Sequence, residues 1–132
     1  MANQSVQRFR QLTEELQGEV VDGAVQELND QADRLVQFMI AAAPYDEGNL
    51  QHSVRKVPGK RKTQVRIVAG GKLTIRPSVS TKPFDYSRAD EFGTLHMRAK
   101  PFFFPTYRLM KKKIISAMKR KITKAIKERS AE

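Results

Sequence analysis

The sequence predicts an α+β domain in which helices pack on a small antiparallel β-sheet. Near both ends of the chain, apolar residues recur every three or four positions, which is typical of amphipathic helices. Between these regions they alternate at every second position, which is typical of strands with one solvated face. The 132 residues suit one domain, so we expect residues 1–132 to share a single core.

The first 43 residues are expected to be helical and acidic. A first apolar stripe consists of Val6, Phe9, Leu12 and Leu16. A second stripe consists of Val21, Val25, Leu28, Ala32, Leu35, Val36, Met39 and Ala43. Ser5 is a suitable cap for the first helical piece, and Gly18 and Gly23 are expected to loosen the chain between two pieces. Pro44 should end the second piece, because the residue before a proline is disfavoured in the α conformation.

Residues 52–100 are expected to form the β-sheet. Short strands are predicted at 65–69 and 73–76, with turns at 58–60 and at 70–71. An irregular loop is expected at 77–85. For residues 86–92 the pattern fits both a last strand and a short helix, and periodicity does not decide between them.

The clearest helix is predicted at 105–129. Its stripe consists of Tyr107, Met110, Ile114, Met118, Ile122 and Ile126. Residues 108–129 contain ten Lys or Arg and only one acidic residue, Glu128. This polar face has three interpretations: a surface that faces DNA, a solvated face, and a membrane-surface helix. The membrane interpretation is the least favoured, whereas the sequence is nearly neutral between the other two.

Charge is distributed unevenly along the chain. Residues 1–50 hold three Lys or Arg and nine Asp or Glu, whereas residues 51–132 hold 22 and five, within a net charge of +11. A basic half can attract DNA, RNA, an acidic protein or the acidic half of an identical subunit. The last of these favours head-to-tail contacts, which close into rings.

The residues that could support catalysis or metal binding are few. The chain has no cysteine and two histidines, His52 and His96, which lie far apart in the sequence. The adjacent carboxylates at 46–47 and 90–91 need not converge, as paired catalytic acids must. The glycine pairs lack phosphate-binding spacing. We therefore expect no enzyme activity, no catalytic residue, no cofactor and no metal.

Two further expectations concern location and the aromatic run. No apolar run approaches the ~20 residues that span a bilayer, and the N-terminus lacks the features of a secretory signal, so a soluble protein made in a cytoplasm is expected. The run Phe102–Phe104 could stack on nucleic-acid bases. The favoured interpretation is that it belongs to the core, since aromatic burial is a large term.

Three segments of the chain follow recognisable patterns. Residues 43–53 fit A-P-x-x-x-G-x-L-x-x-S, residues 86–94 are similar to Y-A-x-x-x-E-F-G-T, and residues 97–106 contain a stretch similar to A-x-P-F-x-x-P-A. In these segments the chain resembles a family of minor tail components of long-tailed bacteriophages. It departs from the family at Ser87, where alanine is more frequent, and at Thr106, where alanine is common. Order and spacing also match, so the resemblance covers roughly residues 20–127.

The resemblance implies a tail-terminator-like fold and a structural role. Members of the family are neck, tail-completion or head–tail connector proteins, so the chain is expected to form a homo-oligomeric, sixfold ring in the virion. It is expected to meet adjacent neck and tail-tube proteins, with DNA passing through the lumen without sequence specificity and with no membrane contact. The protein would be synthesised in the cytoplasm of the host bacterium.

The residues that carry the resemblance are expected to be structural. They are Pro44, Gly48, Leu50, Ser53, Tyr86, Glu91, Gly93, Thr94, Pro101, Phe102 and Pro105. Gly48 suits a tight turn and Gly93 a positive φ or a close backbone approach. Pro101 and Pro105 fix the entry to the last helix. Glu91 either caps a helix or pairs across a subunit boundary.

The C-terminal helix supplies the candidates for a surface that faces DNA or a partner protein. They are Lys111, Lys112, Lys113, Lys119, Arg120, Lys121 and Lys124. The alternative function is a small basic nucleic-acid-binding protein, which needs only the basic half and the aromatic run. Oligomeric state distinguishes the two, because a connector must be able to form rings.

Overall fold

The described part of the chain consists of two long helices, two short helices and two two-stranded ribbons. The computed structural model describes residues 2–45, 48–76 and 84–130. In chain order the elements are α1 (Ala2–Ala42), α2 (Asn49–Ser53), β1 (Arg55–Pro58), β2 (Val65–Val68), β3 (Ile75–Arg76), β4 (Phe84–Asp85), α3 (Tyr86–Phe92) and α4 (Phe104–Ser130). This composition confirms the predicted α+β class.

The N-terminal region is one continuous helix. α1 contains 41 residues, which corresponds to roughly 60 Å at 1.5 Å per residue. The expected break at Gly18 and Gly23 is therefore wrong, and Ser5 lies inside the helix and not at its start. A glycine costs a helix only about 1 kcal/mol relative to alanine, and the long helical flanks of α1 tolerate that cost. The helix ends just before Pro44, as expected.

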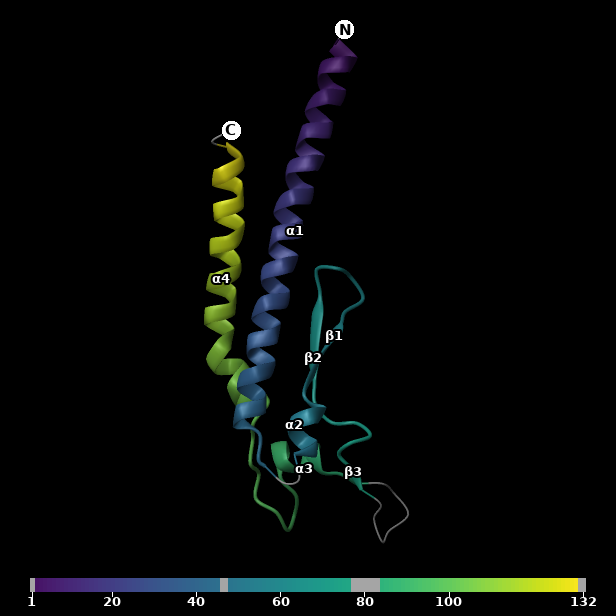
Figure 1. Cartoon of the computed structure of the whole chain (residues 1–132), viewed down its shortest axis with the longest axis vertical. Coiled ribbons are helices and arrows are strands. Elements are labelled where there is room, and N and C mark those ends of the chain that lie inside the picture. The colour runs from purple at the N-terminus through teal and green to yellow at the C-terminus, as the bar shows by residue number, and fades with distance from the viewer. Residues whose placement is uncertain (1, 46–47, 77–83, 131–132) are drawn as a thin grey trace.

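α1 lies between the other two large elements (Figure 1). α4 runs antiparallel along one side of α1, and the β1–β2 hairpin lies against α1 on the other side. The C-terminal helix thus packs mainly on α1 and not across a sheet. The N-terminal part of α1 extends well past the C-terminal end of α4 (Figure 1).

The strands form two separate ribbons. β1 pairs antiparallel with β2, from Arg55 opposite Val68 to Pro58 opposite Val65. β3 pairs antiparallel with β4, so the single sheet expected from the sequence is divided. Gly70 and Gly71, both with positive φ, stand between β2 and β3 and redirect the chain. Residues 77–83 of the expected loop lie outside the described residues, whereas 84–85 form β4, and 86–92 form a helix.

The core lies where the C-terminal half of α1 meets α2, β2 and the start of α4. Its buried residues are Leu35, Val36, Met39, Ala43, Leu50, Val54 and Phe102, with Ile67, Met110 and Ile114 packed against them. The second apolar stripe of the N-terminal region is thus buried where it contributes to this core. Within the described residues, no helix is long and apolar enough to cross a membrane.

Candidate functional site

Glu91 caps the start of α4. Its Oε2 accepts hydrogen bonds from the backbone N–H groups of Phe102 (2.8 Å) and Phe103 (2.9 Å), and its Oε1 accepts one from Phe104 (2.9 Å). The first N–H groups of a helix have no partner within the helix, and negative charge is favoured at that end. Because Glu91 is only 8 % exposed, its carboxylate fixes α3 to the N-terminus of α4 inside the protein.

Asp85 plays the same role at the start of α3. Its Oδ1 accepts hydrogen bonds from the backbone N–H of Ser87 (3.0 Å), the Ser87 hydroxyl (2.7 Å) and the Thr74 hydroxyl (2.7 Å). Thr74 is fully buried. Burial acts to raise the pKa of Asp85, but the hydrogen bonds from Ser87 and Thr74, with the nearby Arg88 guanidinium, outweigh it and hold the pKa below 3.8. The carboxylate is therefore the form that suits this fold.

Ser53 links α2 to the end of β2. Its buried hydroxyl donates to the carbonyl of Leu50 (2.6 Å) and accepts from the backbone N–H of Gly70 (3.0 Å). The Arg55 guanidinium donates to the carbonyls of Ser53 and Gly70, at 2.8 Å each. A Cβ at Gly70 would lie 2.5 Å from the Ser87 hydroxyl oxygen, so only glycine allows this close approach to α3.

The third segment leads into α4 through a tight approach. Gly93 has φ 77° and ψ 173°, and a Cβ there would lie 2.9 Å from the backbone nitrogen of Ala99. The Thr106 hydroxyl donates to the carbonyl of Phe102 at 2.6 Å. Pro105 lies in the first turn of α4, where a missing N–H costs no intrahelical bond. Pro101 precedes the buried Phe102.

These contacts bring residues of the three family-like segments together. We call the cluster of Ser53, Gly70, Asp85, Ser87 and Glu91 the polar junction. Leu50 and Phe102 are buried in the adjoining core. Four other residues that carry the resemblance lie outside the polar junction. Gly48 precedes α2 with φ 82°, and Pro44 is half-buried. The Tyr86 hydroxyl donates to the Leu73 carbonyl (3.4 Å), and the Thr94 hydroxyl accepts from the His96 N–H (3.3 Å).

Three members of this network were not found from the sequence. Asp85, two positions before Ser87 and directly before a helix, is a signal for an N-cap that could have been recognised. Thr74 and Arg55 gave no such signal, because the contacts that tie them into the network are with Asp85 and Gly70, which are far from them in the sequence. In the described residues, no group of three or more His, Asp or Glu is placed to hold a metal ion. His52 and His96 are both exposed.

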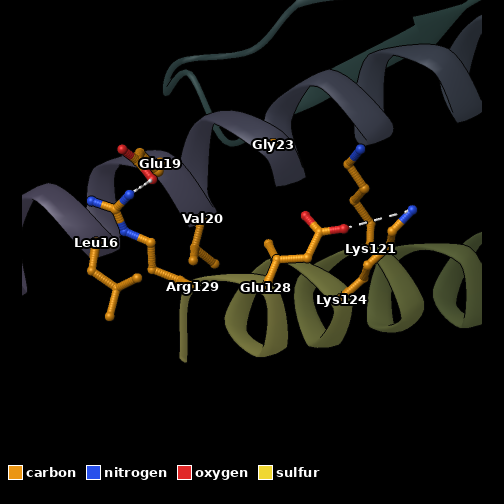
Figure 2. Close-up of a pocket in the computed structure, with 9 residues that line it drawn as sticks. Leu16, Glu19, Val20, Gly23, Lys121, Lys124, Glu128 and Arg129 are labelled. Atoms are coloured by element: carbon orange, nitrogen blue, oxygen red, sulfur yellow. Dashed lines mark ion pairs between the residues drawn. The ribbon is translucent and has the colours of Figure 1, made fainter. Parts of the chain in front are cut away.

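The seven basic candidates of α4 divide by direction. At 100° per residue, Lys112, Lys119 and Arg120 lie on the side of α4 away from α1, and Lys111 and Lys113 lie at its borders. Lys121 and Lys124 line a cleft between α4 and α1 (Figure 2). Lys127 joins the outer group, although the sequence analysis did not single it out. We call Lys112, Lys119, Arg120 and Lys127 the basic face.

The cleft in Figure 2 holds charged groups that already have partners. The Arg129 guanidinium contacts Glu19 of α1 (3.2 Å), and Lys124 lies 3.9 Å from Glu128. Lys121 reaches α1 near Gly23. The basic face lies outside this cleft and is exposed.

Acidic residues of α1 are also paired with the hairpin. Lys62 contacts Asp22 at 2.7 Å, and Lys56 contacts Asp33 at 2.8 Å. Exposed pairs of this kind contribute little stability, typically 0–1 kcal/mol. They nevertheless show that part of the attraction between the acidic and basic halves acts within one chain.

Comparisons with protein-family models, with curated proteins and with solved structures found no match.

A substitution at Asp85 tests the junction through its pH dependence. Asp85→Ala is expected to lower the free energy of unfolding by about 1–2 kcal/mol at pH 7, because it removes a helix cap and leaves the Thr74 hydroxyl without its acceptor. Since the pKa of Asp85 is lowered in the folded protein, its contribution is complete above the unfolded pKa and is lost as the pH falls through the folded value. Urea unfolding of both proteins should show a constant difference from pH 7 to pH 5 and a smaller one only below pH 3.8.

The matched control for this experiment is Asp30→Ala, which removes an exposed carboxylate of α1. It should change stability by less than about 0.5 kcal/mol. A difference for Asp85→Ala that is the same at every pH, or that disappears between pH 7 and pH 5, would contradict the role assigned to the charged carboxylate.

Proposed function

We propose that the protein is a structural component of the head–tail junction of a tailed bacteriophage. It is proposed to assemble as a homo-oligomeric, sixfold ring that completes the tail or connects it to the DNA-filled head, and to act without catalysis, cofactor or metal. The proposal comes from the resemblance of the three segments, and the single observation that supports it is their convergence at the polar junction and its adjoining core.

The chemistry of the junction suits a structural role. Glu91, Asp85 and Ser53 are each engaged with backbone groups of other elements. A carboxylate that holds three backbone N–H groups fixes the orientation of a helix and is not available as a base. Glu91, which belongs to the second family-like segment, thus holds α3 against the start of α4, and a fixed arrangement of helices is what a subunit needs to present the same surfaces to each neighbour.

The location of the protein in the particle provides the direct test. Virions of the phage whose genome encodes this chain can be treated with an antibody against it and a gold label, then viewed by electron microscopy. The proposal predicts label at the junction of head and tail. Label along the tail fibres or in the host lysate alone would contradict it. An antibody against the major capsid protein serves as the matched control.

The basic face supports a further part of the proposal, contact with DNA in the lumen. Three of its residues, Lys119, Arg120 and Lys127, line one shallow depression on α4. None of its four residues takes part in an ion pair within the part of the chain that the structure describes. Lysine and arginine contact phosphates without reading sequence.

Replacing three residues of the basic face should weaken DNA binding in a predictable way. In the triple variant Lys112→Gln, Lys119→Gln and Arg120→Gln, we expect the slope of log Kobs against log salt to become shallower by about 2–3, since each lost phosphate contact changes it by about 0.9. Fluorescence anisotropy with a labelled random duplex measures this slope. No DNA binding by the unchanged protein at low salt would contradict the lumen assignment.

The matched control removes the same charge elsewhere. It replaces three exposed basic residues of the hairpin turn and the following loop, which are Lys60, Arg61 and Lys72. This variant should keep most of the salt slope. If both triple variants lose binding equally, attraction is a property of the net charge and not of the basic face.

The alternative function is a small nucleic-acid-binding protein, which the exposed basic face of α4 also favours. The two functions differ in what the polar junction is for. A free binding protein does not need to present surfaces to neighbouring subunits of a ring, so it should bind DNA fully as a monomer or dimer, and the gold label should be absent from virions.

A further inference from the structure

The N-terminal part of α1 presents an apolar stripe that α4 does not cover. The last turns of α4 lie beside Leu16 and Glu19, where Arg129 contacts α1. Beyond this point Val6, Phe9 and Leu12 are 50 %, 70 % and 58 % exposed. We call residues 4–16 of α1 the overhang. By helical spacing, this stripe lies on the same side of α1 as Leu16 and Val20, which line the cleft against α4. Figure 1 shows that α1 extends past the described end of α4, so this apolar surface has no helix of the described chain packed on it.

Charges border this stripe in a particular order. Arg8 and Arg10 lie in the N-terminal half of the overhang, and Glu14 and Glu15 lie in its C-terminal half. Arg8 and Glu15 are seven residues apart, so they occupy the same border of the stripe. Arg10 lies on the other border, whereas Glu14 lies about 40° farther round the helix, on the side away from the stripe. No ion pair joins these four residues to the rest of the described chain.

This order is self-complementary for two antiparallel helices. In an antiparallel pair, one border of the stripe on the first helix lies beside the equivalent border on the second helix. Arg8 of each copy therefore faces Glu15 of the other copy. The pair Arg8–Glu15 is centred between residues 11 and 12. The apolar stripe from Val6 to Leu16 is centred at residue 11. Two features therefore place one twofold axis at nearly the same position.

A parallel pair would be less favourable. It would put the two basic halves at one level and the two acidic halves at another, which sets like charges near each other. The intramolecular partner α4 reaches the overhang only at Leu16, so Val6, Phe9 and Leu12 stay exposed beyond it.

We propose that the overhang binds the overhang of a second copy of this chain as an antiparallel helix pair about a twofold axis near residues 11–12. This inference goes beyond the proposed function and does not depend on it. A standard interface uses about 20–30 residues on each side, whereas the whole overhang has only 13 residues. The association is therefore weak and rises with protein concentration.

Sedimentation velocity of the full chain, over increasing concentration, tests the pairing. The unchanged protein should shift from monomer toward dimer. Arg8→Glu and Glu15→Arg should each stay monomeric, because each variant sets like charges opposite one another. The double variant Arg8→Glu with Glu15→Arg should dimerise again, since the exchange restores both ion pairs. The control Leu109→Ser, which removes an exposed apolar residue of α4, should dimerise like the unchanged protein.

Cross-linking tests the direction of the pair. The chain has no cysteine, so a single introduced cysteine reports one position. In the antiparallel pair, Thr13→Cys lies about 4 Å along the axis from its own copy and should be joined by a short bismaleimide, whereas Ser5→Cys lies about 20 Å away and should not. Circular dichroism should show that all variants keep their helix content, because the overhang lies outside the core.

Three results would overturn the proposal. The first is a protein that stays monomeric at every concentration. The second is a double charge exchange that does not restore the dimer. The third is equal cross-linking of Thr13→Cys and Ser5→Cys, which would indicate a parallel pair.

Discussion

Replacing Phe102 with alanine is expected to lower the free energy of unfolding by about 4 kcal/mol. The ring is 1 % exposed and belongs to the same buried cluster as Met39 and Leu50. Removing a fully buried aromatic ring loses its transfer free energy and leaves a cavity, for a typical cost of 3–5 kcal/mol. Because domains of this size are stable by only about 5–15 kcal/mol, urea unfolding should show a large fall in the midpoint.

The neighbouring Phe104 is the matched control. Its ring is 44 % exposed, and it contacts Phe92 and Phe103 at centroid distances of 6.0 and 5.1 Å. Phe104→Ala should cost about 1 kcal/mol, the value of such an aromatic pair together with a partly buried ring. Equal losses for the two variants would mean that Phe102 does not have the special place in the core that its burial indicates.

Replacing Glu91 with alanine should destabilise the protein by about 3 kcal/mol. The change leaves three backbone N–H groups at the start of α4 without their acceptor, and hydrogen bonds to a charged group are worth about 1.5–3 kcal/mol each. Water can reach part of the vacated space, so the sum is not expected in full. Urea unfolding measures the loss, and hydrogen exchange at the amides of Phe102, Phe103 and Phe104 should accelerate.

Glu91→Gln separates the charge from the shape. The amide keeps one acceptor oxygen, which can serve Phe102 and Phe103, and loses the acceptor for Phe104. We expect a loss between that of alanine and the unchanged protein, near 1–2 kcal/mol. If glutamine is as stable as glutamate, the negative charge contributes nothing to the start of α4.

Much of the fold was accessible from apolar periodicity. The stripe that includes Leu35 and Met39 is buried as its spacing predicts, and the basic C-terminal helix has nearly its expected limits. The continuity of α1 could not be predicted in this way, because Gly18 and Gly23 look like helix breaks when only their neighbours are considered. The long helical segments on both sides keep these glycines helical, and a local pattern does not include that effect.

The polar junction was only partly accessible. The sequence is compatible with two roles for Glu91, a cap and a contact between subunits. In the folded chain its carboxylate accepts hydrogen bonds from three backbone N–H groups of the same chain. The backbone nitrogen of Phe102 lies 2.8 Å from the Glu91 carboxylate, although the two residues are 11 positions apart. This proximity results from tertiary packing, which a local sequence pattern does not contain. The same reason explains why Arg55 was missed, whereas Asp85 had a local capping signal.

Folding pairs part of the acidic half of the chain with its basic half. The sequence suggested that the acidic half meets the basic half of a neighbour. In the folded chain Asp22, Asp33 and Glu19 already contact basic groups of the hairpin and α4. The basic face of α4 takes part in none of these contacts, which is why its salt dependence is a sharper test than the net charge.

The proposed role at the head–tail junction is tested most directly by disrupting this gene in its phage and viewing the resulting particles by electron microscopy. We predict separate DNA-filled heads and free tails, with joined virions restored when the unchanged gene is supplied in trans. Normal numbers of fully joined, infectious virions from the disrupted gene would contradict the proposed function.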